Sequence, residues 1–212
     1  ALRRSELDGY VGAAGEASEL IVRSLHQAAD LVNSFRQVSV DQASAQRRRF
    51  ELGLACQEIV ATLMNKVRLA GHALVLEVPG GIAMDSYPGP LGQVLINFVN
   101  NALLHAFEGP GGSMRLSAEL IDSDWVRIAF ADDGRGIARE HLARVFDPFF
   151  TTRMGQGGTG LGLNIAHTIA TSLLGGAIRV ESAPGSGTVF VLELPLRAPV
   201  TRPLPDPQGT LH

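Results

Sequence analysis

Four polar side chains recur at every fourth position in the apolar stretch LGQVLINFVNNALLHAF, residues 91–107. At this spacing they share one stripe of an α-helix whose other faces are apolar, and they are Gln93, Asn97, Asn101 and His105. Asparagine is a mediocre helix former, and a buried amide costs free energy unless it is hydrogen-bonded. An amide oxygen can also ligate Mg²⁺, which usually takes few protein ligands together with phosphate oxygens. The stripe therefore predicts either a cation and phosphate site or a network of structural amides.

A carboxylate and two sets of glycines follow in the second half of the chain. In the motif DDGRGI, Asp132 comes at the end of a predicted strand, where it can accept a hydrogen bond from a ligand amine while Gly134 and Gly136 let the backbone pass close. The motif GQGGTGLGL, residues 155–163, precedes a predicted apolar helix, and glycines at such a position can cradle phosphate with backbone N–H groups. Between the two motifs, Arg153 is placed to meet an anion. The glycine pattern lacks the Lys-Ser/Thr of a P-loop and has no evident strand before it, so it fits neither a Walker A nor a Rossmann motif.

Composition limits the class of protein. The chain has 212 residues, 45% of them hydrophobic and 18% charged, with a net charge of -3, so we expect one domain plus an extra element and no nucleic acid partner. The single cysteine, Cys56, excludes a disulfide framework and is expected to be an ordinary helix residue. The sequence contains no run of 18 apolar residues and no signal-peptide pattern. We therefore expect a cytoplasmic chain, whose parent protein could be anchored in a membrane through another segment.

Hydrophobic periodicity predicts an extra element and a mixed α/β domain. Apolar residues step by four and three from Leu7 to Phe35, which predicts a long helix that dimerises or belongs to a bundle. We expect residues 39–50 to be a linker and the proline-rich residues 197–212 to be a flexible tail. Between them the predicted helices cover residues 50–69, 91–107 and 164–174, and the predicted strands cover 72–78, 83–86, 114–121, 125–131, 177–182 and 188–194.

The ordered set of motifs resembles the catalytic domain of sensor histidine kinases, within the GHKL ATPase superfamily. The set comprises the asparagine helix, DDGRGI, FDPFFTTR (146–153), GGTGLGL (157–163) and GSGT (185–188), and the resemblance covers roughly residues 50 to 196. It implies a two-layer α/β sandwich, the Bergerat or GHKL fold, over residues 51–196. In this fold a mixed sheet is covered on one face by helices, with ATP bound between the two layers.

The resemblance also implies roles for individual residues. Asn101 would ligate Mg²⁺, Asn97 would lie near the phosphates, and His105 and Arg153 would approach the phosphate chain. Asp132 would accept a hydrogen bond from the adenine amino group.

The resemblance assigns the remaining contacts to backbone groups and to one threonine. Gly134 and Gly136 would allow close approach of the adenine, and Thr188 would support it, often through water. Residues 137–159 would form a lid over ATP. The N–H groups that would face the phosphates belong to Gly158, Gly160, Leu161 and Gly162.

Two positions depart from patterns found in the superfamily. Relatives that hydrolyse ATP carry a glutamate one turn before the metal-binding asparagine, and this chain has Asn97 there. An amide cannot accept a proton from water as a general base must, so we expect poor hydrolysis and transfer of the phosphoryl group to another nucleophile. A frequent lysine is replaced by Leu104, which leaves the phosphate contact to His105 and Arg153.

The N-terminal region resembles the second helix of the hairpin through which sensor kinases dimerise. That assignment covers residues 1–38, and no motif for the phosphoacceptor histidine helix is found in the sequence. We therefore expect this chain to bind ATP without phosphorylating itself. The expected partners are the phosphoacceptor helix of the parent kinase, a response regulator and a second copy. Two alternatives remain open, an inactive nucleotide-binding dimerisation module and an ATPase clamp of the gyrase or Hsp90 type.

Overall fold

The computed structural model describes residues 12–15, 17, 18, 22, 46–153 and 158–200. Residues 12–15, 17, 18 and 22 are helical, and the rest of the predicted N-terminal helix and its dimerising role lie outside the described residues. The same holds for lid residues 154–157 and for the tail beyond residue 200.

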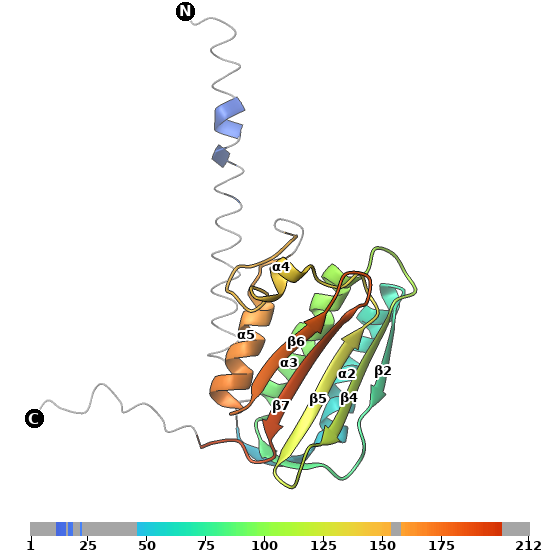
Figure 1. Ribbon diagram of the computed structural model, residues 1–212, viewed down its shortest axis with the longest axis vertical. Helices are drawn as coiled ribbons and strands as arrows, with labels where there is room; N and C mark the ends of the chain where they lie inside the picture. The colour runs from blue at the N-terminus through green and yellow to red at the C-terminus, as the bar shows by residue number, and fades with distance from the viewer. Residues whose placement is uncertain (1–11, 16, 19–21, 23–45, 154–157, 201–212) are drawn as a thin grey trace, which may run out of the picture.

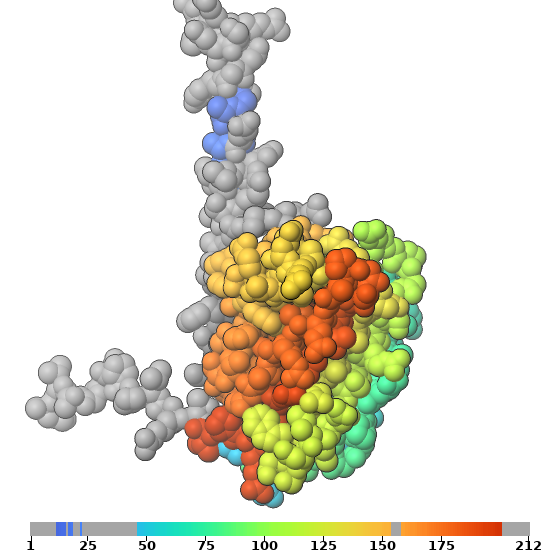
Figure 2. Space-filling view, viewed as in Figure 1, coloured from blue at the N-terminus to red at the C-terminus, as the bar shows by residue number. Residues whose placement is uncertain are grey.

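The described domain is a five-stranded sheet with helices on one face, which confirms the predicted two-layer α/β sandwich. The strands lie in the order β2 (Ala73–Glu77), β4 (Ser113–Leu120), β5 (Trp125–Asp132), β7 (Thr188–Pro195) and β6 (Ala177–Ser182). Strand β2 is parallel to β4, and the other neighbours are antiparallel. Helices α2 (Leu52–Leu69), α3 (Pro88–Asn101) and α5 (Gly162–Thr168) cover one face (Figure 1). The strands are exposed on the other face (Figure 2).

Aromatic packing fixes α3 against the middle of the sheet. Alternation along β5 places Ile128 and Phe130 on the helix side, where both are almost fully buried. Phe98 of α3 stacks on Phe190 of β7 with ring centroids 4.8 Å apart and lies 6.0 Å from Phe130. Polar side chains at the ends of α3, β5 and β7 are therefore held at one edge of the core.

The two helices next to this edge end in π-helical turns. Helix α3 continues as η1 (Ala102–Ala106), and α5 continues as η2 (Ile169–Leu173). The two helices have nearly the predicted extent, but their last turns are π-helical where the sequence predicts a regular α-helix. Because a π turn bonds residue i to i+5, His105 is rotated around the helix relative to Asn101.

Two predicted boundaries are wrong. Residues 48–51, assigned mostly to the linker, form strand β1 (Arg48–Glu51), which pairs with β3 (Ala83–Ser86). A run of three arginines favours a solvated linker, but Arg47 forms a two-pronged ion pair with Asp85 of β3. The predicted tail also starts later than expected, because Ala198 is buried and its N–H donates to the Asp85 carbonyl.

Cys56 is an ordinary core residue of α2, as predicted. Its side chain is fully buried, and burial raises the pKa of the thiol to about 12. The thiol therefore stays protonated and packs as a small apolar group. None of the helices in the described part of the chain is both long and apolar enough to cross a membrane.

Candidate nucleotide site

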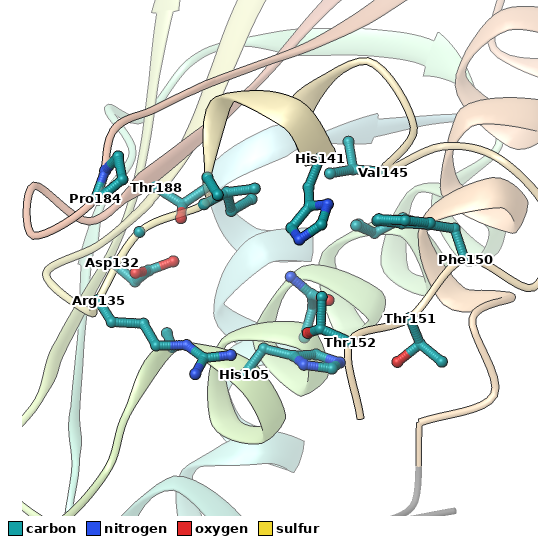
Figure 3. Close-up of a pocket in the computed structure, with 16 residues that line it drawn as sticks. His105, Asp132, Arg135, His141, Val145, Phe150, Thr151, Thr152, Pro184 and Thr188 are labelled. Atoms are coloured by element: carbon teal, nitrogen blue, oxygen red, sulfur yellow. The ribbon is translucent and has the colours of Figure 1, made fainter. Parts of the chain in front are cut away.

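A cavity of about 460 Å³ opens at the edge where β5 ends and β7 begins. Figure 3 shows its lining side chains converging from β5, β7, η1 and the lid segment. The predicted site residues among them are Asn101, His105, Asp132, Gly136 and Thr188. A smaller cavity of about 220 Å³ also has Asn101 and His105 in its wall, together with Asn97, Gly158, Gly160 and Gly162. The two cavities therefore adjoin at Asn101 and His105.

Asp132 is a buried carboxylate in the wall of the larger cavity. Only 7% of it is exposed, and it lies opposite Thr188, which is 4% exposed, in the pairing of β5 with β7. Burial raises the pKa of Asp132, while hydrogen bonds from the backbone N–H groups of Gly134 and Thr188 act in the opposite direction. The Gly134 N–H lies 3.0 Å from Oδ1. A carboxylate held in this way can accept a further hydrogen bond from a ligand amine.

The glycines after Asp132 allow a tight turn against its neighbours. Gly136 has φ +71°, and a Cβ there would collide with the carbonyl oxygen of Ala183. A Cβ on Gly134 would lie 2.5 Å from the side chain and carbonyl of Ala106. Both glycines thus permit a close approach to protein backbone, in η1 and in the β6–β7 turn, and their predicted approach to adenine stays a prediction.

Asn97 and His105 each carry a buried polar atom without a hydrogen-bond partner. Gln93 donates to Asn97 Oδ1 over 3.3 Å, which leaves Asn97 Nδ2 unpaired, and His105 Nδ1 is also unpaired. Buried polar groups are normally hydrogen-bonded, so each such exception calls for an explanation. An amide N–H in the wall of a cavity fits an anionic oxygen, so these residues fit the polyphosphate that the family resemblance implies.

His105 is electrostatically tuned toward its neutral form. Its pKa is lowered mainly by burial and further by the positive charges of Arg153 and Arg135. Arg153 acts on His105 from the lid, although it lines neither cavity. Its backbone N–H donates to Thr151 Oγ1 over 3.1 Å.

The glycine-rich segment before α5 lies against the smaller cavity. Gly158, Gly160 and Gly162 line it, as expected for a phosphate cradle. Leu161 is buried, and its N–H donates to Thr159 Oγ1 over 3.2 Å, so this predicted donor already has a partner. The predicted roles of these four backbone groups remain predictions.

Several residues that line the larger cavity are not predicted from the sequence. Arg135, His141 and Phe150 line the larger cavity, and the rings of His141 and Phe150 lie 5.4 Å apart. A signal for Arg135 is present in the sequence, since it lies between the two glycines of the DDGRGI motif. His141 belongs to the short helix α4 (Arg139–Leu142), which was not predicted. Among the residues that the structure describes, no three His, Cys, Asp or Glu side chains are grouped to hold a metal ion.

Comparisons with known proteins agree with this arrangement. Residues 87–198 match the family described as histidine kinase-, DNA gyrase B-, and HSP90-like ATPase. The two-component sensor PprA of Pseudomonas aeruginosa is 36% identical over 138 residues, which cover 62% of this chain and 15% of that protein. The sensor histidine kinase ZraS of Salmonella typhimurium is 42% identical over 111 residues, which cover 52% of this chain and 23% of ZraS.

Solved structures give the same result. The catalytic domain of the histidine kinase ThkA is 30% identical with a TM-score of 0.64, and the match covers 72% of this chain and 97% of that domain. A complex of ThkA with the response regulator protein TrrA matches with a TM-score of 0.60 and 24% identity, over 92% of this chain and 53% of the matched chain.

The chain belongs to the histidine kinase-, DNA gyrase B- and HSP90-like ATPase family, and within it to the catalytic domains of sensor histidine kinases. The predicted family and fold are thereby confirmed. The chain spans only about a sixth to a quarter of the length of the two curated relatives.

Proposed function

We propose that this domain binds Mg²⁺–ATP and presents its γ-phosphate to a histidine on a helix of the parent kinase. One observation carries the proposal: a buried carboxylate, Asp132, and two residues with unpaired buried polar atoms, Asn97 and His105, line two adjoining cavities. Adenine would occupy the larger cavity beside Asp132 and Thr188. The phosphates would extend past His105 into the smaller cavity.

Asn101 is the residue best placed to hold Mg²⁺, because it lines both cavities at their junction. Its amide oxygen would supply one ligand, and phosphate oxygens and water would supply the others. Bound ATP would supply the phosphoryl group, and Mg²⁺ would neutralise part of the negative charge of the phosphates. The residues of this chain would hold adenine at Asp132, donate hydrogen bonds to the phosphates from Asn97 and His105, and orient the phosphate chain.

The nucleophile would come from the phosphoacceptor helix of the parent kinase. Asn97 cannot act as a general base toward water, so hydrolysis by the domain alone should be slow. A response regulator as the downstream partner, and a homodimer through the N-terminal helix, complete the proposal. The names of the relatives, among them a two-component sensor and a kinase in complex with a response regulator, support this kind of partner.

The test is a calorimetric titration of Mg²⁺–ATP into the wild type, Asp132→Asn and Asp133→Asn. Asp133 is the matched control, since its exposed carboxylate accepts only from the Ser113 N–H among the described contacts. We expect binding by the wild type and Asp133→Asn, weakened tenfold or more by Asp132→Asn, about 1.4 kcal/mol. Failure of the folded wild type to bind ATP would overturn the proposal and leave an inactive dimerisation module.

Hydrolysis distinguishes a kinase domain from an ATPase clamp. Phosphate release is measured with Mg²⁺–ATP, first with this domain alone and then with the full-length parent kinase. We expect little release by the domain and incorporation of γ-phosphate into a histidine of the full-length protein. Rapid multiple-turnover release by the domain alone would favour the clamp.

A further inference from the structure

Arg135 is a cation at the cavity to which neither the motif resemblance nor the fold assigns a role. It lines the larger cavity, and Figure 3 shows its side chain extending from the Asp132 loop toward His105. Within residues 46–153 and 158–200, its guanidinium group forms no hydrogen bond or ion pair. Its charge nevertheless contributes to the lowered pKa of His105. An unpaired guanidinium so close to His105 is available to an anion.

The backbone of Arg135 is held in place from both sides. Its N–H donates to the Ala106 carbonyl over 2.9 Å, and its carbonyl accepts from the Gly185 N–H over 2.8 Å. The flanking residues, Gly134 and Gly136, are packed so closely that neither position has room for a Cβ. The side chain therefore starts from a fixed point, which lowers the entropy lost when the guanidinium engages a ligand. A planar guanidinium matches phosphate oxygens in a two-pronged contact.

We infer that Arg135 binds the α- and β-phosphates of the nucleotide, an inference that rests on the ATP site proposed above. The assignment follows from its position. Arg135 lines the larger cavity together with Asp132, and it does not line the smaller cavity with the glycines of residues 158–162. It therefore lies where the phosphate chain leaves the adenine cavity, before the region expected to hold the γ-phosphate. Arg135 and Arg153 then divide the polyphosphate between them, with Arg153 toward its end.

The test compares Arg135→Gln with Arg139→Gln. Arg139 is an exposed arginine of α4 that lines neither cavity, so its variant loses the same charge nearby. Binding of Mg²⁺–ATP and Mg²⁺–ADP is measured by calorimetry, and binding of adenosine by NMR titration, with circular dichroism as the check on folding. We expect Arg135→Gln to weaken ATP and ADP binding by about tenfold each and to leave adenosine within about twofold. Arg139→Gln should match the wild type with all three ligands.

Three results would overturn the inference. They are unchanged binding of both ATP and ADP by Arg135→Gln, a loss of adenosine binding equal to that of ADP, and a loss confined to ATP. The first means that the side chain is merely solvated, the second that it shapes the adenine cavity, and the third that it meets the γ-phosphate. Each is distinct from failure of the proposed function, in which the folded wild type binds no ATP.

Discussion

The larger cavity has two walls that are built in different ways. One is the fixed wall, residues 132–137, and the other is the lid segment, residues 138–153. The fixed wall is bonded to residues distant in the sequence, through Asp133 to Ser113, Arg135 to Ala106, Gly134 to Gly187 and Ile137 to Ser182. The lid segment is built largely from local turns, in which the N–H groups of His141, Arg144, Asp147 and Phe150 each donate to the carbonyl three residues earlier.

Packing repeats the contrast. Asp132 at the end of β5 is buried, whereas Phe149 in the lid segment is 42% exposed. Among the described residues, the lid segment is tied to α5 by a hydrogen bond from Asn164 Nδ2 to the Phe146 carbonyl over 2.9 Å and by the rings of Phe146 and His167, 5.3 Å apart. Within the lid segment, Arg144 lies over the Phe150 ring at 4.7 Å. Local turns with few long-range bonds open at low free-energy cost. The fixed wall is therefore preformed, and the lid segment can rearrange when a ligand binds.

The largest expected effect comes from a substitution that destabilises the fixed wall. Gly136→Ala places a methyl group on the Ala183 carbonyl and a side chain at φ +71°. We expect the free energy of unfolding to fall by about 3 kcal/mol or more, with loss of ATP binding. The measurement is urea denaturation followed by circular dichroism. Gly185→Ala is the control, since it has φ +77° with open space around the Cβ, and it should cost only about 1–2 kcal/mol. Equal losses in the two variants would show that the close approach at Gly136 does not matter.

The next largest effect is expected at Asn101, which lines both cavities. Asn101→Ala should weaken Mg²⁺–ATP binding about tenfold and abolish the weakening that EDTA causes in the wild type. Adenosine binding should not change. The control, Asn65→Ala, removes an amide of α2 that lines neither cavity. If EDTA weakens ATP binding by Asn101→Ala as much as by the wild type, the cation is held by another group.

The sequence predicts the fixed wall far better than the lid, for a physical reason. Alternation along β5 and the glycines after Asp132 are each dictated by a packing constraint that leaves a trace in residue type. The bounds of the helices and strands around the core can also be predicted, because the spacing of apolar residues in the sequence determines these elements. In the lid segment, α4 has only four residues and no buried side chain, so no pattern of apolar residues predicts this helix.

Other features could not be predicted because they depend on partners distant in the chain. Strand β1 is stabilised by its backbone pairing with β3 and by the ion pair of the preceding Arg47 with Asp85. A run of arginines in the sequence predicts neither interaction. The π turn at His105 has no residue signature. The sequence could place Asn97 on the correct stripe, but only the structure shows that Gln93 occupies its oxygen and leaves its nitrogen unpaired.

A smaller effect tests the backbone of the lid. Phe149 has φ 66°, a left-handed conformation that costs a non-glycine residue about 1–2 kcal/mol. We therefore expect Phe149→Gly to be more stable than Phe149→Ala by about 1 kcal/mol in urea denaturation. Thr152 is the control in the same segment, since its φ is not positive, and there alanine should be the more stable by several tenths of a kcal/mol. The same order at both positions would mean that the backbone at Phe149 relaxes.

The smallest effect lies between the two walls, at His105. Burial and two arginines lower its pKa in the folded state, so the unfolded chain takes up a proton that the folded chain resists. The free energy of unfolding should therefore begin to fall as the pH drops below about 7.5, and it should continue to fall until the pH passes below the lowered pKa of the folded state. Denaturation midpoints of the wild type and His105→Gln across this range isolate the contribution, because the variant lacks the titrating group.

The pH dependence caused by His105 has one contribution from Arg153 in the lid segment and another from Arg135 in the fixed wall. Arg153 contributes more than Arg135 to the lowered pKa of His105, although Arg153 lines neither cavity. Arg153→Gln should therefore flatten the pH dependence more than Arg135→Gln does. The reverse order would place the charge of the fixed wall nearer to His105 than that of the lid. In that case the Arg153 side chain would lie farther from His105 in the free protein in solution than the Arg135 side chain does.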